Sequence, residues 1–199
     1  MNLGIFGGTF DPVHRGHLTL ARHAFEQCGL DQLLFVPAGY PPHRPPPHAN
    51  AAHRQAMLEL AIADEPQFAI SPCELTRRGP THSIDTLAHL AARHPTATLF
   101  LLLGGDAWRS FRRWHRWADI LDIAQLVVLD RAATAGHEHH ADKKPVAGPP
   151  AQFLSGPPLA ISATAIRAAL KDPAKNADQL RAWLPAAVLD YIAAHRLYR

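Results

Sequence analysis

The feature that most constrains this chain is the run from Gly7 to His17, which follows a short apolar stretch, Leu3 to Phe6, and leads into a helical pattern. Two adjacent glycines after a strand let the backbone approach a ligand without a Cβ in the way. The Asp11-Pro12 pair favours an extended turn before the helix begins. Free N–H groups at a helix start attract an anion, so this strand, loop and helix predict a phosphate-binding site.

Two histidines, His14 and His17, lie three residues apart at the start of this helix, so their rings should share one side of it. The run has neither the Lys-Ser/Thr ending of a Walker A loop nor the glycine order of a dinucleotide-binding loop. Half of a metal site and ordinary helix-start histidines are the alternatives. We favour contact with a nucleotide phosphate, because no third metal ligand has a fitting spacing and Gly16 suits close approach.

The remaining pattern alternates apolar strands with helices, which predicts an α/β fold. We expect a doubly wound, Rossmann-like, mainly parallel sheet with helices on both faces and a C-terminal helical segment. Strands are expected at 3–6, 33–36, 68–70, 99–103 and 126–129. Helices are expected at 17–28, 51–63, 83–93, 159–171 and 186–195. Ser83 or Thr81 should cap the third helix, and Ala56, Leu60 and Ala63 should share one face of the second.

Two segments interrupt the alternation. Residues 37–47 are rich in proline and could act as a lid, while residues 132–150 mix Gly, Pro and Lys with histidines at 137, 139 and 140 and read as a mobile loop. A loop with adventitious metal-binding histidines is the alternative for the second segment. Neither interruption divides the chain, so we expect one domain over residues 1–199.

Composition indicates the cellular compartment of the protein and the classes of ligand it could bind. Cys28 and Cys73 lack metal-ligand spacing and no secretory leader is present, which predicts a cytoplasmic protein. The longest apolar runs have strand length, so no membrane insertion is expected. A net charge of +3 suits anionic ligands but does not indicate nucleic acid. Residues 108–117 interleave arginines with aromatic residues, and we interpret them as a short helix with apolar anchors rather than a single-strand stacking platform.

Several short motifs then resemble a known family. The run Gly8 to His17 and the run Ile161 to Arg167 resemble the paired signatures of the nucleotidylyltransferase superfamily. Further motifs narrow the resemblance to bacterial nicotinate mononucleotide adenylyltransferases: Pro41-Pro42-His43-Arg44, Met57 to Ala61, Ser83 to Leu87, Gly105-Asp106, Trp114 and the ending Leu197-Tyr198-Arg199. These motifs follow one order along the chain and leave only 132–150 unmatched.

The resemblance implies an enzyme of NAD biosynthesis that transfers AMP from ATP to nicotinate mononucleotide. It implies catalytic roles for His14, His17 and Arg167. The residues expected to bind ATP are Gly7, Gly8, Thr9, Phe10, Gly104, Asp106, Ile161, Ser162 and Thr164. Those expected to bind nicotinate mononucleotide are Arg44, Ser83, Trp114 and Arg131. Mg²⁺ is expected on the phosphates, with no metal ligand from protein side chains.

Some of these roles have support from the residues themselves. Ser162 is a good N-cap for the helix that follows, and Thr164 and Arg167 should share a face of that helix. Asp106 follows two glycines at a strand end and could bind sugar hydroxyls, or instead cap a helix at Trp108. The runner-up functions are the same transfer to nicotinamide mononucleotide or phosphopantetheine, and a nucleotide-binding sensor without turnover. An oligomer is possible.

Two departures from the family pattern concern the acceptor. His82 stands where the family usually has tyrosine, and Arg131-Ala132-Ala133 replaces the usual Arg-Pro-Gly. The first change leaves a backbone contact to the nicotinate carboxylate possible but weakens the case for a side-chain contact. The second relaxes a turn. Neither affects the two histidines.

Overall fold

The apolar strands form one six-stranded sheet in the order β3-β2-β1-β4-β5-β6, and every neighbouring pair is parallel. This computed structural model describes residues 1–40, 46–131, 149–156 and 161–199, without the side chains at 130 and 131. The strands are β1 (Asn2–Gly8), β2 (Gln32–Pro37), β3 (Phe68–Ile70), β4 (Thr98–Gly104), β5 (Ala124–Arg131) and β6 (Ala151–Gly156).

Both faces of the sheet are buried, and the strands alternate between them. In β2, Leu33 and Phe35 pack into one core cluster, while Leu34 and Val36 pack into the other. Parallel strands covered on both sides consist of nearly continuous apolar runs, which is the pattern seen in the sequence. The helices must therefore divide between the two faces.

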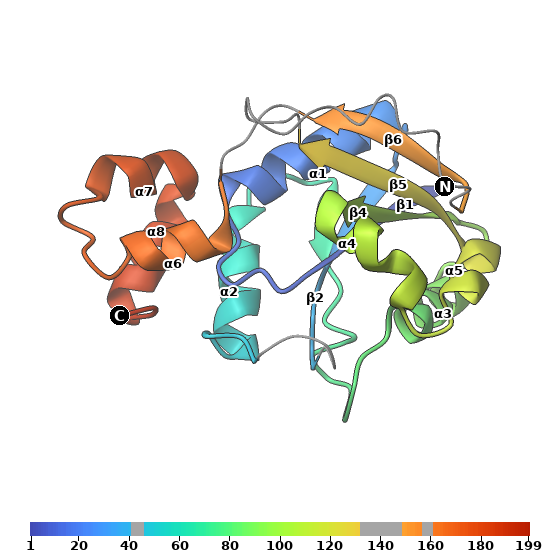
Figure 1. The fold of residues 1–199 in the computed structure, drawn as a ribbon, viewed down its shortest axis with the longest axis horizontal. Helices are drawn as coiled ribbons and strands as arrows, with labels where there is room; N and C mark the ends of the chain where they lie inside the picture. The colour runs from blue at the N-terminus through green and yellow to red at the C-terminus, as the bar shows by residue number, and fades with distance from the viewer. Residues whose placement is uncertain (41–45, 132–148, 157–160) are drawn as a thin grey trace.

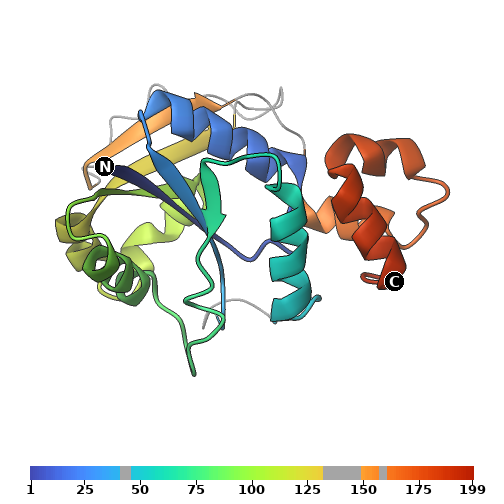
Figure 2. The same cartoon turned by 180° about the vertical axis from the view of Figure 1, so that it is seen from behind.

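Figures 1 and 2 show this division. On one face lie α1 (Arg15–Gln27) and α2 (Ala51–Ala61), and the apolar residues of both helices belong to the same core cluster. The opposite face carries α3 (Ser83–Arg93), α4 (Gly105–Ser110), the 3₁₀ turn η1 (Phe111–Arg113) and α5 (Trp117–Ile123). A C-terminal group beside α2 contains α6 (Ala163–Ala169), α7 (Ala177–Trp183) and α8 (Ala186–Ala194).

The fold class and the five expected strands are confirmed, and the sheet is wholly parallel among the described strands. The sixth strand, β6, was not expected from the sequence. It lies at the edge of the sheet, where Gln152 and Phe153 are exposed, so it lacks the continuous apolar run of the central strands. The short helix α7 was not expected either.

The helix expectations hold in position but not in every detail. The expected face of α2 is wrong: Leu60 is exposed, and the buried residues are Arg54, Met57 and Leu58. The helix expected from residue 159 begins at Ala163, and residues 157–160 lie outside the described part. The loop expected at 132–150 lies almost wholly outside it too. Among the described residues, no helix is long and apolar enough to cross a membrane.

Candidate active site

The chain reverses its winding direction between β1 and β4, which are neighbours in the sheet. From β1 the chain passes through α1 to β2, and from β4 it passes through α4 to β5 on the other side. Such a switch point opens a crevice beyond the carboxyl ends of the two strands, where open α/β sheets bind ligands. Gly7 and Gly8 end β1 and Gly104 ends β4, so all three expected ATP-binding glycines lie at this edge.

The two histidines lie together at the start of α1. Their rings stack with centroids 3.8 Å apart and an interplanar angle of 25°, so the expectation of one shared side is confirmed. His14 is the N-cap residue and is only 2% exposed. The backbone N–H of His14 donates to Nδ1 of His17 at 3.3 Å. A neutral His17 ring therefore carries its proton on Nε2, where it can act as a donor.

Aromatic packing fixes the position of His17. Its ring lies edge-on to Phe10, with centroids 5.0 Å apart, and to Phe6 at 6.2 Å. Phe10 adopts a left-handed backbone conformation (φ 49°) that is uncommon for a residue with a Cβ, and its ring is buried. Only the backbone of Phe10 is thus available to a ligand. Thr9 lies in the same loop, where its carbonyl is already a hydrogen-bond acceptor.

Residues from the far end of the chain meet this loop. The guanidinium of Arg167 donates to the carbonyl of Asp11 at 2.8 Å and to the hydroxyl of Thr164 at 3.3 Å. The second contact confirms that Thr164 and Arg167 share a helix face. The first brings the positive charge of α6 to the loop that leads into His14. Arg167 and the loop that carries the two histidines therefore lie together, while their convergence around ATP stays a prediction.

The start of α6 also packs close to the start of α1. A Cβ added to Gly16 would lie 2.9 Å from Nδ1 of His14 and 3.6 Å from the Cβ of Ile161, so only glycine fits between them. Ser162 is the N-cap of α6, as expected, and its Oγ accepts from the backbone N–H of Ala165 at 3.1 Å. This bond holds the first turn of α6 in place next to the histidines.

At the end of β4, Asp106 lies in the first turn of α4 with its side chain exposed. The N-cap of α4 is Gly104, so the alternative role of Asp106 as a helix cap is wrong. The carboxylate pairs with Arg109, three residues further along the helix. An exposed pair of this kind is weak and leaves the carboxylate open to another partner.

A second group of expected residues gathers at the start of α3. The rings of His82 and His115, which are the chain neighbours of Ser83 and Trp114, lie 4.5 Å apart. His82, and not Ser83 or Thr81, is the N-cap of α3, because Ser83 is already helical. His82 makes no side-chain cap hydrogen bond, so the first backbone N–H groups of α3 stay available to an anion.

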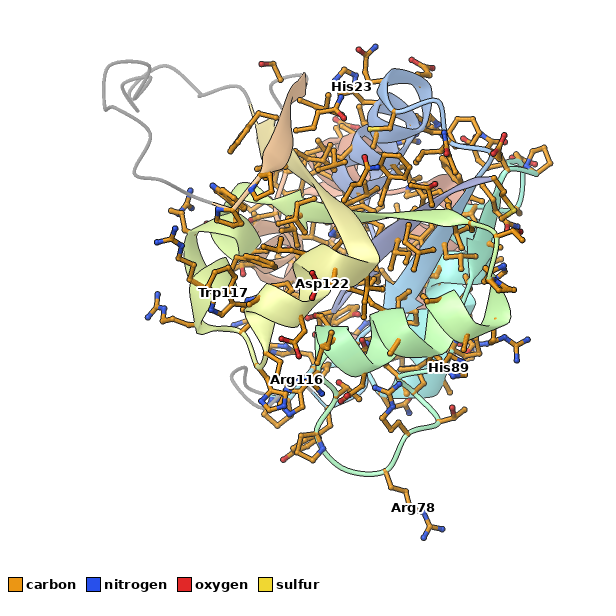
Figure 3. All side chains as sticks on the ribbon, turned by 90° about the vertical axis from the view of Figure 1, so that its right-hand side faces the viewer. His23, Arg78, His89, Arg116, Trp117 and Asp122 are labelled. Atoms are coloured by element: carbon orange, nitrogen blue, oxygen red, sulfur yellow. The ribbon has the colours of Figure 1, made fainter. Side chains whose placement is uncertain are left out.

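Trp114 is half-buried and offers an aromatic face. It packs against Phe111 with ring centroids 5.4 Å apart, and its Nε1 donates weakly to Oγ of Ser110 at 3.4 Å. Trp117 packs on Phe111 as well, under the guanidinium of Arg112. The aromatic side chains of residues 108–117 are thus anchored against the core, as interpreted from the sequence. Figure 3 labels Trp117 at the start of α5 and Arg116 just before it.

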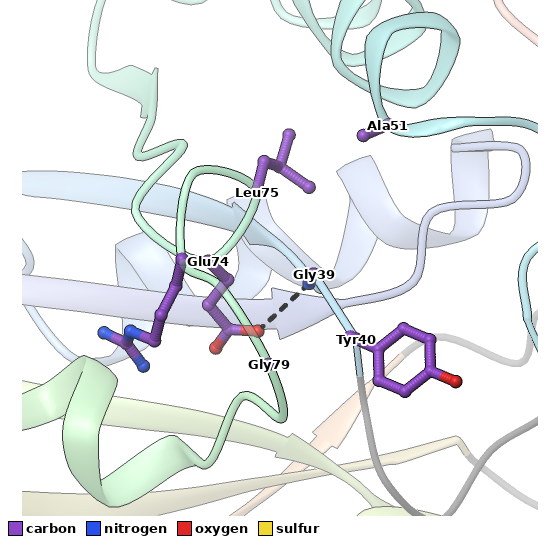
Figure 4. A pocket seen from close by; sticks show the side chains of 7 residues that line it. Gly39, Tyr40, Ala51, Glu74, Leu75 and Gly79 are labelled. Atoms are coloured by element: carbon purple, nitrogen blue, oxygen red, sulfur yellow. Dashed lines mark hydrogen bonds between the residues drawn. The ribbon is translucent and has the colours of Figure 1, made fainter.

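An open cavity of about 430 Å³ lies between the end of β2 and the loop before α3. Figure 4 shows Glu74 in its wall. Its two carboxylate oxygens accept from the backbone N–H of Gly39 at 3.3 Å and from the hydroxyl of Thr86 at 2.8 Å. Gly39 is required here, because an added Cβ would lie 2.2 Å from the backbone oxygen of Glu74. Glu74 therefore joins β2 to the first turns of α3.

Known proteins resemble this chain over its whole length. A family model described as cytidylyltransferase-like matches residues 5–169. A protein of Pseudomonas aeruginosa named "Probable nicotinate-nucleotide adenylyltransferase" is 42% identical, covering 99% of this chain and 97% of its own length. A protein of the same name from Laribacter hongkongensis is 44% identical, covering 99% and 94%. The chain belongs to the nicotinate-nucleotide adenylyltransferase family.

Solved structures of this family share the fold. A nicotinic acid mononucleotide adenylyltransferase of Plasmodium falciparum, complexed with APC, aligns with a TM-score of 0.76 at 19% identity, covering 99% of this chain and 96% of its own. The same protein complexed with NaAD aligns with a TM-score of 0.75 at 20% identity, covering 99% and 97%. At such low identity the match supports the fold alone.

Not every expected residue of this adenylyltransferase can be placed. Arg44 lies outside the described residues, and Arg131 is placed only through its backbone in β5. Within the described residues, no group of three or more His, Cys, Asp or Glu side chains could hold a metal ion.

Sequence reasoning missed one residue that shapes the loop. Arg54, which is 2% exposed, donates through its two terminal nitrogens to the carbonyls of Thr9 and Ala38, each at 2.8 Å. Burial lowers the pKa of Arg54, and the nearby carboxylate of Asp11 opposes that effect. The helical spacing could have indicated that Arg54 is buried, because Arg54 lies three residues before Met57 and four before Leu58. All three residues lie on the buried face of α2.

Proposed function

We propose that this chain transfers the adenylyl group of ATP to nicotinate mononucleotide, releasing pyrophosphate and forming nicotinate adenine dinucleotide. The observation that carries the proposal is the meeting of Arg167 with the loop that leads to His14 and His17. Relatives about 40% identical over the full chain bear the name of this activity. A protein that only sensed a nucleotide would have no need to gather donors around a reacting phosphate.

The reaction asks little covalent chemistry of the protein. A phosphate oxygen of nicotinate mononucleotide, already ionised near neutral pH, attacks the α-phosphorus of ATP, and the bond to the bridging oxygen of pyrophosphate breaks. No general base is required, so alignment and stabilisation of charge dominate. We assign His14 to the α-phosphate oxygens, and His17, Arg167 and the helix start at Ser162 to the β- and γ-phosphates.

The rest of the ATP site follows from the two strand ends. The backbone of Gly7, Gly8, Thr9 and Phe10 lines the phosphates on one side. Ile161 and Thr164 line them on the other, next to Gly16 and Arg167. At the end of β4, Gly104 gives the backbone room and Asp106 would accept hydrogen bonds from sugar hydroxyls, exchanging its weak pairing with Arg109.

The acceptor would lie at the start of α3. The free N–H groups near Ser83 suit the nicotinate carboxylate, and the ring of Trp114 suits stacking with the pyridine. An aromatic stack adds about 0.5 to 1.5 kcal/mol beyond area burial. Arg44 and Arg131 remain proposals for the acceptor phosphate that rest on the sequence motifs alone. His82 in place of tyrosine makes the backbone the main contact.

We also propose Mg²⁺ as the cofactor. Since the described residues hold no cluster of metal ligands, the ion would bind mainly phosphate oxygens and water. It would supply positive charge to the departing pyrophosphate. We place the enzyme in the cytoplasm, where its two free cysteines, Cys28 and Cys73, would stay reduced. Nucleic acid is not proposed as a partner, because the tryptophans of residues 108–117 are anchored on Phe111.

Turnover on three acceptors tests the proposal. Pyrophosphate release should be measured with nicotinate mononucleotide, nicotinamide mononucleotide and phosphopantetheine at equal concentrations. The carboxylate contact near Ser83 predicts the highest kcat/KM for nicotinate mononucleotide, by about tenfold or more for one charge-assisted contact. Equal kcat/KM values for nicotinate mononucleotide and nicotinamide mononucleotide would overturn the acceptor assignment. If the protein binds ATP but releases no pyrophosphate with any of the three acceptors, the enzyme assignment is overturned.

A further inference from the structure

Tyr198, near the end of the chain, reaches the loop that carries the two histidines. Its hydroxyl donates to Oδ1 of Asp11 at 2.8 Å, across 187 positions of sequence. The side chain of Asp11 is only 5% exposed. The transfer reaction as derived above makes no use of this contact, although it joins the last turn of the protein to the loop between β1 and α1.

The backbone around Tyr198 takes a conformation that its residues do not favour by themselves. Arg196 (φ 52°) and Tyr198 (φ 64°) are both left-handed, which is uncommon for residues other than glycine. The N–H of Leu197 donates to the carbonyl of Ile192, which folds the chain back over the end of α8. Such conformations persist only where the surrounding structure holds them. Here, Leu197 and Tyr198 pack against the core cluster shared with α1 and α2.

Asp11 links this turn to the catalytic groups. Its carboxylate accepts from Tyr198 and from the backbone N–H groups of His48 at 2.7 Å and Ala49 at 3.0 Å, and Nδ1 of His48 lies 3.3 Å away. Its carbonyl accepts from Arg167 at 2.8 Å. The side chain of Asp11 is therefore held by the C-terminal turn and the entry to α2, while its backbone holds the guanidinium.

We infer that Tyr198 is a positioning residue for adenylyl transfer: its hydroxyl fixes Asp11, and the carbonyl of Asp11 fixes Arg167 next to the histidine pair. The inference rests on the proposed function, because it concerns the same reaction. Tyr198 acts through Asp11 and is not assigned a contact with substrate. Loss of its hydroxyl would let the guanidinium shift from the position where it stabilises charge, and small misplacements of this kind reduce rate steeply.

The contact persists at the pH of an ordinary assay. Burial, followed by the charge of Asp11 and the hydrogen bond to it, raises the pKa of Tyr198 far above its usual value. The hydroxyl therefore keeps its proton and stays a donor.

A matched pair of tyrosines tests the inference. Tyr198→Phe removes the hydroxyl that contacts Asp11, and Tyr191→Phe removes a hydroxyl on α8 that lies 2.9 Å from Nδ1 of His53 instead. We expect kcat to fall about tenfold in Tyr198→Phe, with the KM for nicotinate mononucleotide within about twofold. In Tyr191→Phe, kcat should stay within about twofold. The Tm should fall by a similar amount in both variants, about 2–4 °C, so a loss of stability cannot explain the difference in kcat.

A double-mutant cycle with Asp11→Asn tests whether Tyr198 acts through Asp11. If it does, Asp11→Asn and Tyr198→Phe should each lower kcat, and the double variant should lose less than the product of the two effects. Equal kcat in the two tyrosine variants, or fully multiplicative effects with Asp11→Asn, would overturn the inference while the function stands. A wild-type protein that releases no pyrophosphate would overturn the proposed function and this inference with it.

Discussion

At the scale of single residues, the site depends on a few side chains whose orientation is set by neighbours rather than by their own conformational preferences. His17 is held between the ring of His14 and the rings of Phe10 and Phe6. Its Nδ1 is occupied by the backbone N–H of His14, so its tautomer is fixed whenever the ring is neutral. A donor held in this way loses little conformational entropy when it binds a phosphate. Preorganised donors of this kind contribute strongly to transition-state stabilisation.

His17→Ala should therefore lower kcat by about a hundredfold or more, with only a modest loss of unfolding free energy. Steady-state pyrophosphate release and thermal unfolding measure the two quantities. His23→Ala is the matched control, since His23 lies on the same helix at the outer edge of the molecule (Figure 3). A His17→Ala enzyme with the rate of the His23→Ala enzyme would contradict the assignment.

At the scale of elements, the acceptor half of the site depends on how α3 is attached to the sheet. Glu74 makes this attachment by accepting from the N–H of Gly39, just after β2, and from the hydroxyl of Thr86, in the second turn of α3. The guanidinium of Arg77 adds a weaker contact to the same hydroxyl at 3.4 Å. The start of α3, where Ser83 offers its backbone, is thus positioned from outside the helix.

Glu74→Ala should leave the N–H of Gly39 without its acceptor, which costs about 1–3 kcal/mol of unfolding free energy. Because α3 would also loosen, the KM for nicotinate mononucleotide should rise several-fold while the KM for ATP changes little. Denaturant unfolding and initial rates measure both effects. Glu59→Ala, which removes an exposed contact with Gln55, is the control and should change both quantities little. Similar values for the two variants would refute the role of Glu74.

The element scale also shows what local sequence patterns could and could not predict. The central strands were predictable because burial on both faces demands continuous apolar runs. The glycines that end β1 and the histidines that follow them lie within one local motif. The edge strand β6, with Phe153 exposed, carries no such pattern. Contacts of Arg54 with Thr9 and of Glu74 with Thr86 join separate elements, so no local spacing encodes them.

At the scale of the whole molecule, the first loop is tied to three distant parts of the chain. Asp11 contacts the entry to α2, the helix α6 through Arg167, and the turn after α8 through Tyr198. A site assembled from segments this far apart forms only when the fold is complete. Global stability and the geometry of the site should therefore respond to the same perturbation.

High pH supplies such a perturbation. The pKa of Tyr198 is raised in the folded protein by burial and by Asp11, whereas an unfolded chain would have the ordinary tyrosine pKa of about 10. Above that pH the unfolded state loses the proton and the folded state keeps it, so stability falls as pH rises, with a slope from this group approaching about 1.4 kcal/mol per pH unit. Below pH 9 its contribution should be constant.

Denaturant unfolding of the wild type and Tyr198→Phe between pH 8 and 11 measures the difference: the wild type should lose more stability than the variant. Parallel curves for the two proteins would show that the buried hydroxyl does not link the end of the chain to the first loop as described.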